Sequence, residues 1–402
     1  MTTSALRVIV IGAGLGGLAL AQGLRRDGIE VSVYERDASP TSRRQGYRLR
    51  LNPDGLHALD ELLPPPLSHL VWATTSPQPP TVILDARLDQ LSTTDPGASA
   101  DGGRNVAVNR LTLRQILLHG LDDIVHFGKE CTGYRIHADS TVTAHFRDGT
   151  RATGDVLVAA DGVNSAVRRQ YLPHARVMDT GVRVIYGRFP LTPETTVLIP
   201  DRLFTLYTGI VGPDHQHVGL APVQYHTPPS DAVTRLAPTL DLADTEDYMM
   251  CLFSARTELL PHTDAELHRA SGQQLRDMAA DMTRSWNPLL GSIIALWQPE
   301  SVFPLTIRSS VPLTPWPTST VTLLGDAIHA MSPAVGVGAN TALRDALTLA
   351  TQLGKAARGA DLVSSLHTYE ADMTAYGFDA VRTSARYGQQ RIGQAPLPDP
   401  TS

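Results

Sequence analysis

Residues 7–37 read RVIVIGAGLGGLALAQGLRRDGIEVSVYERD, and this stretch decides the fold of the first part of the chain. The apolar run Val8–Ile11 predicts a buried strand, and residues with helical spacing follow from Leu18 to Arg26. Gly28 closes that helix, and Val31–Tyr34 forms a second strand. A strand, a helix and a strand in this order are typical of an α/β fold.

Three glycines mark the turn between the first strand and the helix. Gly12, Gly14 and Gly17 have the spacing G-x-G-x-x-G, which permits a tight turn, close approach to a pyrophosphate and close packing of helix on strand. Glu35 ends the second strand, where a carboxylate can hold the ribose hydroxyls of an adenine dinucleotide. The combination predicts dinucleotide binding, but it does not distinguish FAD from NAD(P).

A second turn of this kind lies within residues 321–353, VTLLGDAIHAMSPAVGVGANTALRDALTLATQL. The apolar run at its start predicts a strand that ends at Asp326, and an amphipathic helix begins near Asn340. Gly336 and Gly338 let the loop backbone come close to a flat or charged group, beside the positive N-terminus of the helix. Asp326 can accept a hydrogen bond from a ribityl or ribose hydroxyl, although an ordinary capped turn would be the simpler explanation if the stretch stood alone.

The segment 154–165, GDVLVAADGVNS, repeats the arrangement of strand, acid and glycine. Asp161 and Gly162 follow its apolar run. The next helix starts with polar side chains that could meet phosphate oxygens: Ser165, Arg168 and Arg169. Three such turns in one chain are hard to explain by turn chemistry alone, so they predict a shared ligand site at the strand ends.

Positive charge is concentrated in and before residues 47–51, YRLRL. The alternation predicts a strand that aims Arg48 and Arg50 along one face. Neighbouring arginines add to this charge: Arg36, Arg43 and Arg44. The group could receive an anionic nicotinamide dinucleotide, and a solvated sheet edge is an equally good explanation.

Two more arginines lie on one face of a helix predicted over residues 109–118. Arg110, in the first turn, can point at whatever the strand ends bind. Arg114, one turn later, is expected at the surface or in a supporting position.

The composition limits the class of protein. The chain has 402 residues, enough for two packed domains, and its net charge of −6 argues against general nucleic-acid binding. Cys131 and Cys251 lie far apart without metal-ligand spacing, so we expect free thiols in a reducing compartment and no metal site. No apolar run approaches the roughly 20 residues of a membrane span, so we expect a cytoplasmic protein.

Residues 172–300 carry no dinucleotide motif. Alternating segments predict strands, and helical spacing runs from Asp264 to Trp286 and again up to Trp297. A sheet with helices in this position would form a substrate-binding domain. Its pocket could be lined by Phe204, Tyr207, Tyr225 and Met249, although each of these residues is more commonly part of a sheet core.

In this combination of motifs the chain resembles the class A flavoprotein monooxygenases. These single-component FAD enzymes include aromatic hydroxylases, terpenoid epoxidases and tetracycline-inactivating enzymes. The resemblance rests on the three glycine-containing turns in their order along the chain. It implies that Glu35, with Arg36, binds the FAD ribose, that Arg110 reaches the diphosphate, and that Asp326 holds the ribityl chain. It also implies that Asp161 and Gly162 lie in the FAD and NAD(P)H region. Further residues are implied against the isoalloxazine ring: Pro333, Gly336, Val337, Gly338, Ala339 and Asn340.

The same resemblance implies the domain organisation. The expected fold is α/β, with a discontinuous Rossmann-like FAD-binding domain, a mixed β-sheet substrate domain and C-terminal helices. The FAD-binding domain would comprise residues 1–171 and 301–391, and the substrate domain residues 172–300. Residues 392–402 are expected to form a flexible tail.

The implied activity is that of a monooxygenase. NAD(P)H would reduce FAD, O₂ would add to the flavin C4a carbon, and the hydroperoxide would transfer one oxygen to a bound organic substrate. Pro333 and the loop after it would exclude water at the ring. We expect Arg48 and Arg50 to gate the flavin or orient NADPH, and His329 to be a structural hydrogen-bonding residue.

Other functions remain open at this stage. An oxidase or reductase of the same fold would need no oxygen-transfer pocket, and a tetracycline-type inactivating enzyme would share all three turns. A non-enzymatic scaffold would lack bound flavin. The substrate is expected to be a small apolar aromatic, polyketide or terpenoid compound. The choice of NADH or NADPH, the type of oxygenation and the oligomeric state stay open.

Overall fold

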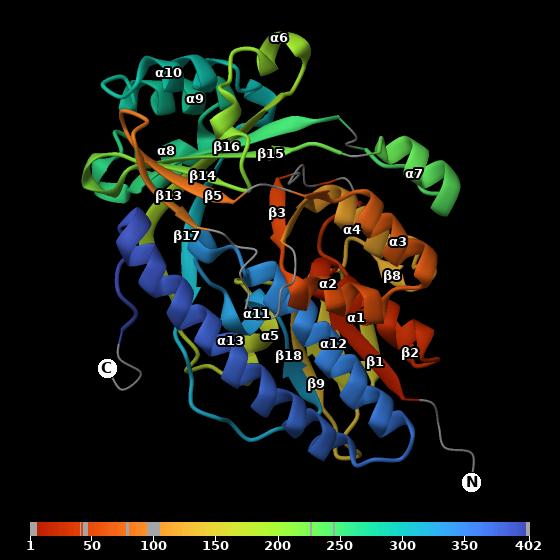
Figure 1. Ribbon diagram of the computed structural model, residues 1–402. Coiled ribbons are helices and arrows are strands. Elements are labelled where there is room, and N and C mark those ends of the chain that lie inside the picture. Colours follow the sequence, from red (N-terminus) through yellow and green to blue (C-terminus); the bar gives the residue numbers. More distant parts are fainter. Residues whose placement is uncertain are drawn as a thin grey trace.

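The computed structural model describes residues 6–40, 42, 47–77, 80–94, 105–225, 227–243 and 246–398. Structural statements below refer to these residues. Figure 1 shows two parts: a parallel sheet with its helices below, and a larger, mainly antiparallel sheet with its own helices above. Arg43 and Arg44, which belong to the predicted cluster of positive charge, lie outside the described residues.

The lower part is built on a five-stranded sheet in the order β18-β12-β1-β2-β8, with every pair parallel. Its strands are β1 (Arg7–Ile11), β2 (Glu30–Tyr34), β8 (Val125–His126), β12 (Val156–Ala159) and β18 (Val321–Leu323). Ile11 pairs with both Tyr34 and Ala159, and Ala159 pairs with Leu323. Four strands therefore end in one row, although one of them comes from the far end of the chain. The Rossmann-like part is discontinuous, as the sequence predicts.

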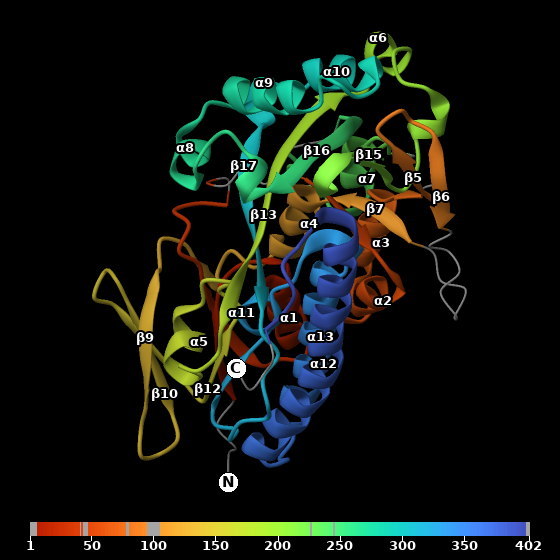
Figure 2. The same cartoon turned by 90° about the vertical axis from the view of Figure 1, so that its left-hand side faces the viewer.

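Helices cover one face of this sheet. They are α1 (Leu15–Arg26), α2 (Pro53–Leu62), α12 (Gly338–Ala357) and α13 (Leu362–Ile392). Figure 2 shows the other face covered by α5 (Ala166–Tyr171) and a small antiparallel sheet of β9 (Cys131–Ile136), β10 (Val142–Phe146) and β11 (Arg151–Gly154). Residues 15–24 of α1 are all buried, Leu18, Leu20 and Leu24 fully, because the helix packs against α12, α2 and α4 (Arg110–Leu118) as well as against strands of the sheet.

The upper part is a seven-stranded sheet in the order β17-β13-β16-β15-β14-β5-β6. Its strands are β5 (Thr81–Asp85), β6 (Gln90–Thr94), β13 (Val177–Pro190), β14 (Thr208–Val211), β15 (His217–Val223), β16 (Tyr248–Arg256) and β17 (Phe303–Ser310). The β14–β5 pair is parallel and the others are antiparallel, so the sheet is mixed. β5, β6 and β17 join this sheet although they lie outside the expected limits 172–300.

The two faces of the upper sheet have different partners. Its outer face packs under α8 (Asp264–Arg269), α9 (Gly272–Met282) and α10 (Pro288–Ala295), as the top of Figure 2 shows. Its inner face turns toward the lower part, where β3 (Arg48–Leu51) and β7 (Val106–Asn109) form a small sheet with β4 (Ser76–Pro77). The inner face is therefore the wall that lies opposite the nucleotide-binding part.

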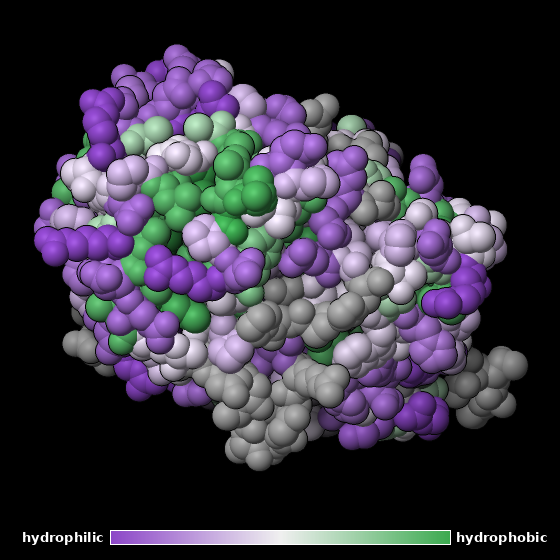
Figure 3. Space-filling model, turned by 45° about the horizontal axis from the view of Figure 1, so that its top comes forward, coloured by the Kyte–Doolittle hydropathy of each residue, from purple (hydrophilic) through white to green (hydrophobic). Residues whose placement is uncertain are grey.

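Short helices and turns complete the chain. They are α3 (Pro65–Ala73), α4 (Arg110–Leu118), α6 (Pro193–Thr196), α7 (Pro229–Leu236), α11 (Asp326–His329), η1 (Asp201–Leu203), η2 (Pro213–His215), η3 (Thr257–Leu259), η4 (Pro299–Ser301) and η5 (Pro333–Val335). Within the described chain, no helix is both long and apolar enough to cross a membrane. Both cysteines are buried and free, as predicted. Figure 3 shows mostly hydrophilic residues on one face of the molecule, with hydrophobic residues gathered in one region of it.

Three sequence-based expectations need correction. The helix expected from Asp264 to Trp286 is two helices, because Ser271 starts a second one with a capping box. The sequence predicts a short helix from Pro53 to Leu62 that the prolines at 64–66 stop; α2 ends there as predicted, but Pro65 then takes the first position of α3. The tail expected from residue 392 is tied down at its start, since the N–H of Ala395 donates to the carbonyl of Thr180. Residues 399–402 lie outside the described residues.

Candidate functional site

Four turns leave the parallel sheet at one edge. Gly12, Glu35, Asp161 and Asp326 each follow within three residues of the paired row at the ends of β1, β2, β12 and β18. In open α/β sheets, ligands bind outside the carboxyl ends of the strands. The three turns singled out from the sequence therefore meet at the edge where a dinucleotide would lie.

The glycines of the first turn have separate structural reasons. A Cβ on Gly12, whose φ is +109°, would lie 2.3 Å from the carbonyl oxygen of Ala160. A Cβ on Gly17 would lie 2.2 Å from the carbonyl oxygen of Gly12. A Cβ on Gly14 would meet nothing within 4 Å, and no side chain caps the N-terminus of α1 beside it. Gly14 thus leaves room for a pyrophosphate at a helix N-terminus that can bind anions.

Glu35 lies beside this opening. Its carboxylate is buried and accepts hydrogen bonds from the N–H of Ala13 (2.8 Å) and the N–H of Asp37 (2.9 Å). A cavity of about 60 Å³ is lined by Gly14, Glu35, Arg110 and their neighbours. Each carboxylate oxygen can accept a second hydrogen bond, so Glu35 keeps acceptor capacity for a ribose at the cavity.

Three arginines of this region have different surroundings. Arg110 is half-buried in the cavity wall, with its guanidinium 5.4 Å from the ring centroid of Tyr47. Arg36 is exposed and does not line the cavity. Arg114 is buried and donates to the carbonyl of Ala13 at 3.0 Å, so it supports the glycine turn. The sequence allows Arg114 either a surface or a supporting position, and the structure shows the supporting one.

The turn after β12 carries Asp161, whose carboxylate is partly engaged in a hydrogen bond within the turn. One oxygen of Asp161, Oδ2, accepts the N–H of Ala166 at 2.9 Å. The other, Oδ1, is buried and has no partner among the described residues, and burial raises the pKa of this carboxyl. Gly162 has φ +77° and open space where a Cβ would lie. Asp161 therefore retains one oxygen to which none of the described residues donates a hydrogen bond.

The helix after this turn does not offer the phosphate contacts that the sequence suggested. The Ser165 hydroxyl accepts the backbone N–H of Arg168 at 2.9 Å and so caps α5. The Arg168 guanidinium is buried and donates to the carbonyls of Ala327 and Val163, both at 2.8 Å. Arg169 is exposed and donates to the carbonyl of Asn164. These side chains hold neighbouring turns together.

Asp326 differs from Glu35 and Asp161, the other acids at the sheet edge, which accept hydrogen bonds from backbone N–H groups. Its side chain is exposed to solvent, and no hydrogen bond to its carboxylate is found in the described part of the chain. The surrounding protein still removes enough water to raise the pKa of Asp326, against the effect of His329 and Arg110. A carboxylate that is accessible but largely surrounded can accept hydroxyl groups of a ligand.

A buried network fixes the turn that carries Asp326. His329 and Asp345 are both fully buried, and Nε2 of the first lies 2.6 Å from Oδ2 of the second. The same oxygen accepts the N–H of Gly325 at 2.7 Å, and the other accepts the hydroxyl of Tyr376 at 2.7 Å. Burial is the largest influence and acts to lower the pKa of His329, but the Asp345 and Asp326 carboxylates and a backbone hydrogen bond together raise this pKa above its usual value. His329 is structural, in agreement with the sequence-based interpretation.

The loop before α12 presents backbone to the same region. Pro333 is exposed at the start of η5, and Gly336 adopts the left-handed conformation with φ +66°. Val337, Gly338 and Ala339 are half-buried at the start of α12, with no side chain capping it. The loop can therefore offer N–H groups and a helix N-terminus to a flat ring.

Asn340 has a different position from the rest of this loop. It is buried, and its Oδ1 accepts the N–H of Asn52 at 2.9 Å. Its Nδ2 donates to the carbonyls of Arg50 (2.9 Å) and Gly336 (3.3 Å). The oxygen and the nitrogen of the Asn340 amide thus join α12 to the segment before α2. Through its bond to Gly336, Asn340 also holds the loop in place without itself pointing at the ligand region.

Arg48 and Arg50 point between the two parts of the molecule. Arg48 is buried, and burial lowers its pKa to about 10. The groups that also act on this pKa include Tyr248 and Tyr207 of the upper sheet. Arg50 is half-buried, and its Cβ lies 4.0 Å from where a Cβ of Gly336 would be. The two arginines therefore lie between the Gly336 loop and the inner face of the sheet.

The four candidate pocket residues divide between the two faces of the upper sheet. Tyr207 and Tyr225 pack with the inner-face cluster, toward β3. Phe204 and Met249 pack with the outer cluster, under the helices. The prediction that Phe204 and Met249 line a pocket is therefore wrong, because both belong to the core between sheet and helices. The Tyr207 hydroxyl lies 2.7 Å from Nε2 of His217, a neighbour that the sequence did not indicate.

Comparison with known proteins gives the family. Residues 10–70 match the model of an NAD(P)-binding Rossmann-like domain, and residues 216–384 match that of an FAD-binding domain. These models support FAD as cofactor and NAD(P)H as reductant. A crystal structure from Photorhabdus luminescens, described as an FAD-containing monooxygenase, is 34% identical with a TM-score of 0.83, over 96% of this chain and 99% of that one. Klebsiella pneumoniae HpxO, solved with FAD and uric acid, is 25% identical with a TM-score of 0.77, over 96% and 89%.

A curated relative is longer than this chain. A dual O-methyltransferase/FAD-dependent monooxygenase of Phaeosphaeria nodorum is 33% identical over 97% of this chain and 46% of its own length. The chain thus spans about half the length of the curated relatives that it matches first. The near-complete mutual coverage with the Photorhabdus protein, together with the turns at the sheet edge, decides the assignment. The chain belongs to the FAD-dependent monooxygenases.

Proposed function

We propose that the chain uses NAD(P)H and O₂ to insert one oxygen atom into a small, largely apolar organic substrate, by hydroxylation or epoxidation. The balance is one NAD(P)H, one proton, one O₂ and one substrate, giving NAD(P)⁺, water and the oxygenated product. The observation that carries this proposal is the convergence of the Gly14, Asp161 and Asp326 turns at one sheet edge. The names of the relatives, which include a urate hydroxylase and a zeaxanthin epoxidase, support it.

The residues at this edge fit FAD on three observations. The space at Gly14 faces an uncapped helix N-terminus, Asp326 has no hydrogen-bond partner among the described residues, and Glu35 lines the adjoining cavity. Glu35 would hold the ribose, the start of α1 the pyrophosphate and Asp326 the ribityl chain. Bound FAD would supply the hydride acceptor and the site of oxygen activation. The chain's own contribution is to position the flavin and to keep water away from it.

Two loops would position the ring. The backbone from Gly336 to Ala339 would lie against its polar edge, and Pro333 would restrict water beside it. Arg48 and Arg50, on β3 opposite this loop, are proposed to act in the catalytic region. The inner face of the upper sheet, with Tyr207 and Tyr225, would cover the ring and form the substrate pocket. The proposed division assigns residues 172–300, together with β5, β6 and β17 of the same sheet, to the substrate, and the rest of residues 1–171 and 301–391 to FAD.

A two-stage assay tests this proposal. The purified protein should carry FAD, and anaerobic mixing with NADPH or NADH should bleach the flavin absorbance. Under ¹⁸O₂, incubation with aromatic, polyketide and terpenoid compounds should give one product with a single ¹⁸O atom. Consumption of O₂ with hydrogen peroxide as the sole product for every compound would favour the oxidase alternative. A folded protein that does not bind FAD would contradict the proposal.

A further inference from the structure

The interface between the two parts of the molecule contains an unusual group of cations. Arg48 of β3 is buried, and its Nε and Nη2 have no hydrogen-bond partner among the described residues. The Nε of Arg50 is likewise buried without a partner there. Arg391, at the end of α13, is close enough to act electrostatically on Arg50, Tyr207 and His217. Three guanidiniums thus gather beside the inner face of the sheet.

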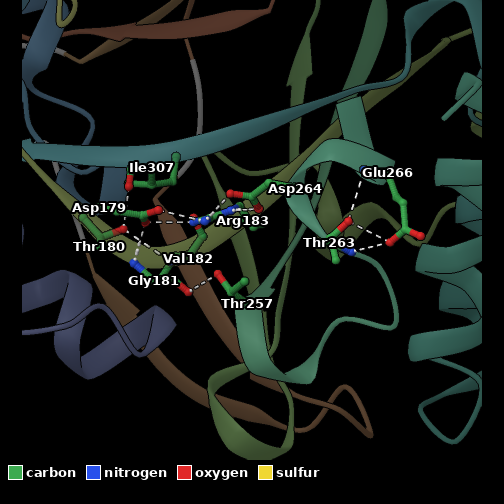
Figure 4. Close-up of polar contacts among 10 residues, drawn as sticks. All are labelled: Asp179, Thr180, Gly181, Val182, Arg183, Thr257, Thr263, Asp264, Glu266 and Ile307. Atoms are coloured by element: carbon green, nitrogen blue, oxygen red, sulfur yellow. Dashed lines mark hydrogen bonds and ion pairs between the residues drawn. The ribbon is translucent and has the colours of Figure 1, made fainter. Parts of the chain in front are cut away.

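Arg183 is another buried arginine of this chain, and its surroundings differ from those of Arg48 because its role is structural. Arg183 of β13 is as buried as Arg48, but it lies between two carboxylates, as Figure 4 shows. It donates to both oxygens of Asp179 at 2.8 Å and to those of Asp264 at 2.6 and 2.7 Å. These acids raise the pKa of Arg183, whereas burial lowers the pKa of Arg48. Arg183 therefore has its counter-charge within the protein.

Among the described residues, Arg48 has no carboxylate partner of this kind. The described groups that act on the charges of Arg48 and Arg50 are Tyr248, Tyr207 and further arginines, and no carboxylate is among them. A buried cation without a partner is costly, and proteins rarely keep one unless an anion binds there. The hydrogen-bonded pair of Tyr207 and His217 lies beside Arg48, so the site also contains a hydroxyl group and an imidazole.

The surroundings indicate what kind of anion fits. Gly209 and Gly219 leave the floor of the sheet free for the rings of Tyr207 and His217, since a Cβ on Gly219 would lie 2.3 Å from the Tyr207 hydroxyl. Tyr186 of the same face stacks with Phe303 at a centroid distance of 5.7 Å. An aromatic and apolar wall next to unpaired guanidiniums suits an organic acid better than inorganic phosphate.

We infer that Arg48 and Arg50, with Tyr207 beside them, bind an ionised oxygen group of an acidic aromatic substrate, a carboxylate or an ionised phenol. This inference rests on the proposed function, because the site adjoins the Gly336 loop where the flavin ring is proposed to lie. It differs from the sequence-based expectation that the two arginines gate the flavin or orient NADPH. The oxygen group would anchor one end of the substrate and direct its opposite end toward the ring.

Equilibrium binding to the FAD-loaded protein tests the inference. Benzoate should bind with a Kd about tenfold or more below that of methyl benzoate, its uncharged analogue. Arg48→Met should abolish the difference, Arg48→Lys should keep part of it, and Arg135→Met, an exposed control on β9, should leave it unchanged. Tighter binding of 4-nitrophenol above its own pKa than below it would identify the phenolate as a ligand. Equal binding of benzoate and its ester, or no binding of either, would overturn the inference.

Two further readouts separate this role from others. Arg48→Met should not lower the melting temperature, because it removes an unpaired buried charge, whereas Arg183→Met should lower it. A fall in the Arg48→Met melting temperature equal to that of Arg183→Met would assign Arg48 to the fold and overturn the inference. A variant with unchanged benzoate binding but slower flavin reduction by NADPH would also overturn it. The FAD content of the wild-type protein is measured before any benzoate titration. A wild-type protein without bound FAD would contradict the proposed function itself, not only the inference about Arg48.

Discussion

Asp345 of α12 and His329 of α11 form a fully buried pair, with 2.6 Å between Oδ2 and Nε2, directly beneath the turn that carries Asp326. The same carboxylate also accepts the N–H of Gly325 and the hydroxyl of Tyr376. The Asp345 side chain on α12 thus joins three segments of the chain: α12 itself, the turn and helix from Gly325 to His329, and α13. The geometry of the ribityl-binding turn that we propose depends on this carboxylate rather than on Asp326 itself.

The pair should make stability depend on pH. The pKa of His329 is raised in the folded protein, so its stabilising contribution is complete below about pH 6.5, the usual value of an unfolded histidine. The contribution is lost as pH rises through the raised pKa. His329→Gln should lower the free energy of unfolding by about 3 kcal/mol at low pH. Urea unfolding of both proteins across pH should show this difference shrinking as pH increases, and a constant difference would contradict the assignment.

The glycines of the first turn should separate folding from cofactor binding. Gly14→Ala adds a methyl group into open space, so the apoprotein should keep its melting temperature but bind FAD more weakly. Gly12→Ala places a Cβ 2.3 Å from the carbonyl oxygen of Ala160 at a positive φ, so it should destabilise the fold. Thermal melts of the apoproteins and FAD titrations distinguish the two effects. Equal FAD affinity for Gly14→Ala and wild type would contradict the proposal that the pyrophosphate binds at this turn.

Asn340 should matter for stability more than for direct contact with the flavin. Asn340→Leu removes the partly buried bonds to the backbone groups of Asn52, Arg50 and Gly336. We expect a loss of about 3 kcal/mol in the free energy of unfolding, from about 1 kcal/mol for each of the three bonds. Asn340→Asp keeps the acceptor for the Asn52 N–H and should lose less. An Asn340→Leu protein of wild-type stability would contradict this position.

The sequence predicts the local elements well where a chemical signal marks their ends. Asn52 and Pro53 mark the start of α2, and the observed helix runs from Pro53 to Leu62 as predicted. Periodicity alone does not reveal an interruption, so the start of α9 at Ser271 was missed. The signal was present as the capping box of Ser271 and Gln274.

The candidate site is predicted less completely, because its supporting contacts join residues far apart in the chain. The strand ends at Glu35, Asp161 and Asp326 follow from motifs, and the structure brings them to one edge. The bonds from Asn340 to residues 50 and 52 depend on tertiary packing and leave no local pattern. Alternation showed that strands have two faces, but only the positions of α8–α10 decide that Met249 faces away from the pocket.

We propose above all that the turns at the carboxyl edge of the parallel sheet bind FAD. Fluorescence titration of the apoprotein with FAD, for wild type and Asp326→Ala, tests it most directly. We expect saturation at one FAD per chain for wild type and at least tenfold weaker binding for the folded variant, since a hydrogen bond to a charged group contributes about 1.5 to 3 kcal/mol. Identical affinity in the two folded proteins, or no saturable binding by wild type, would contradict the claim.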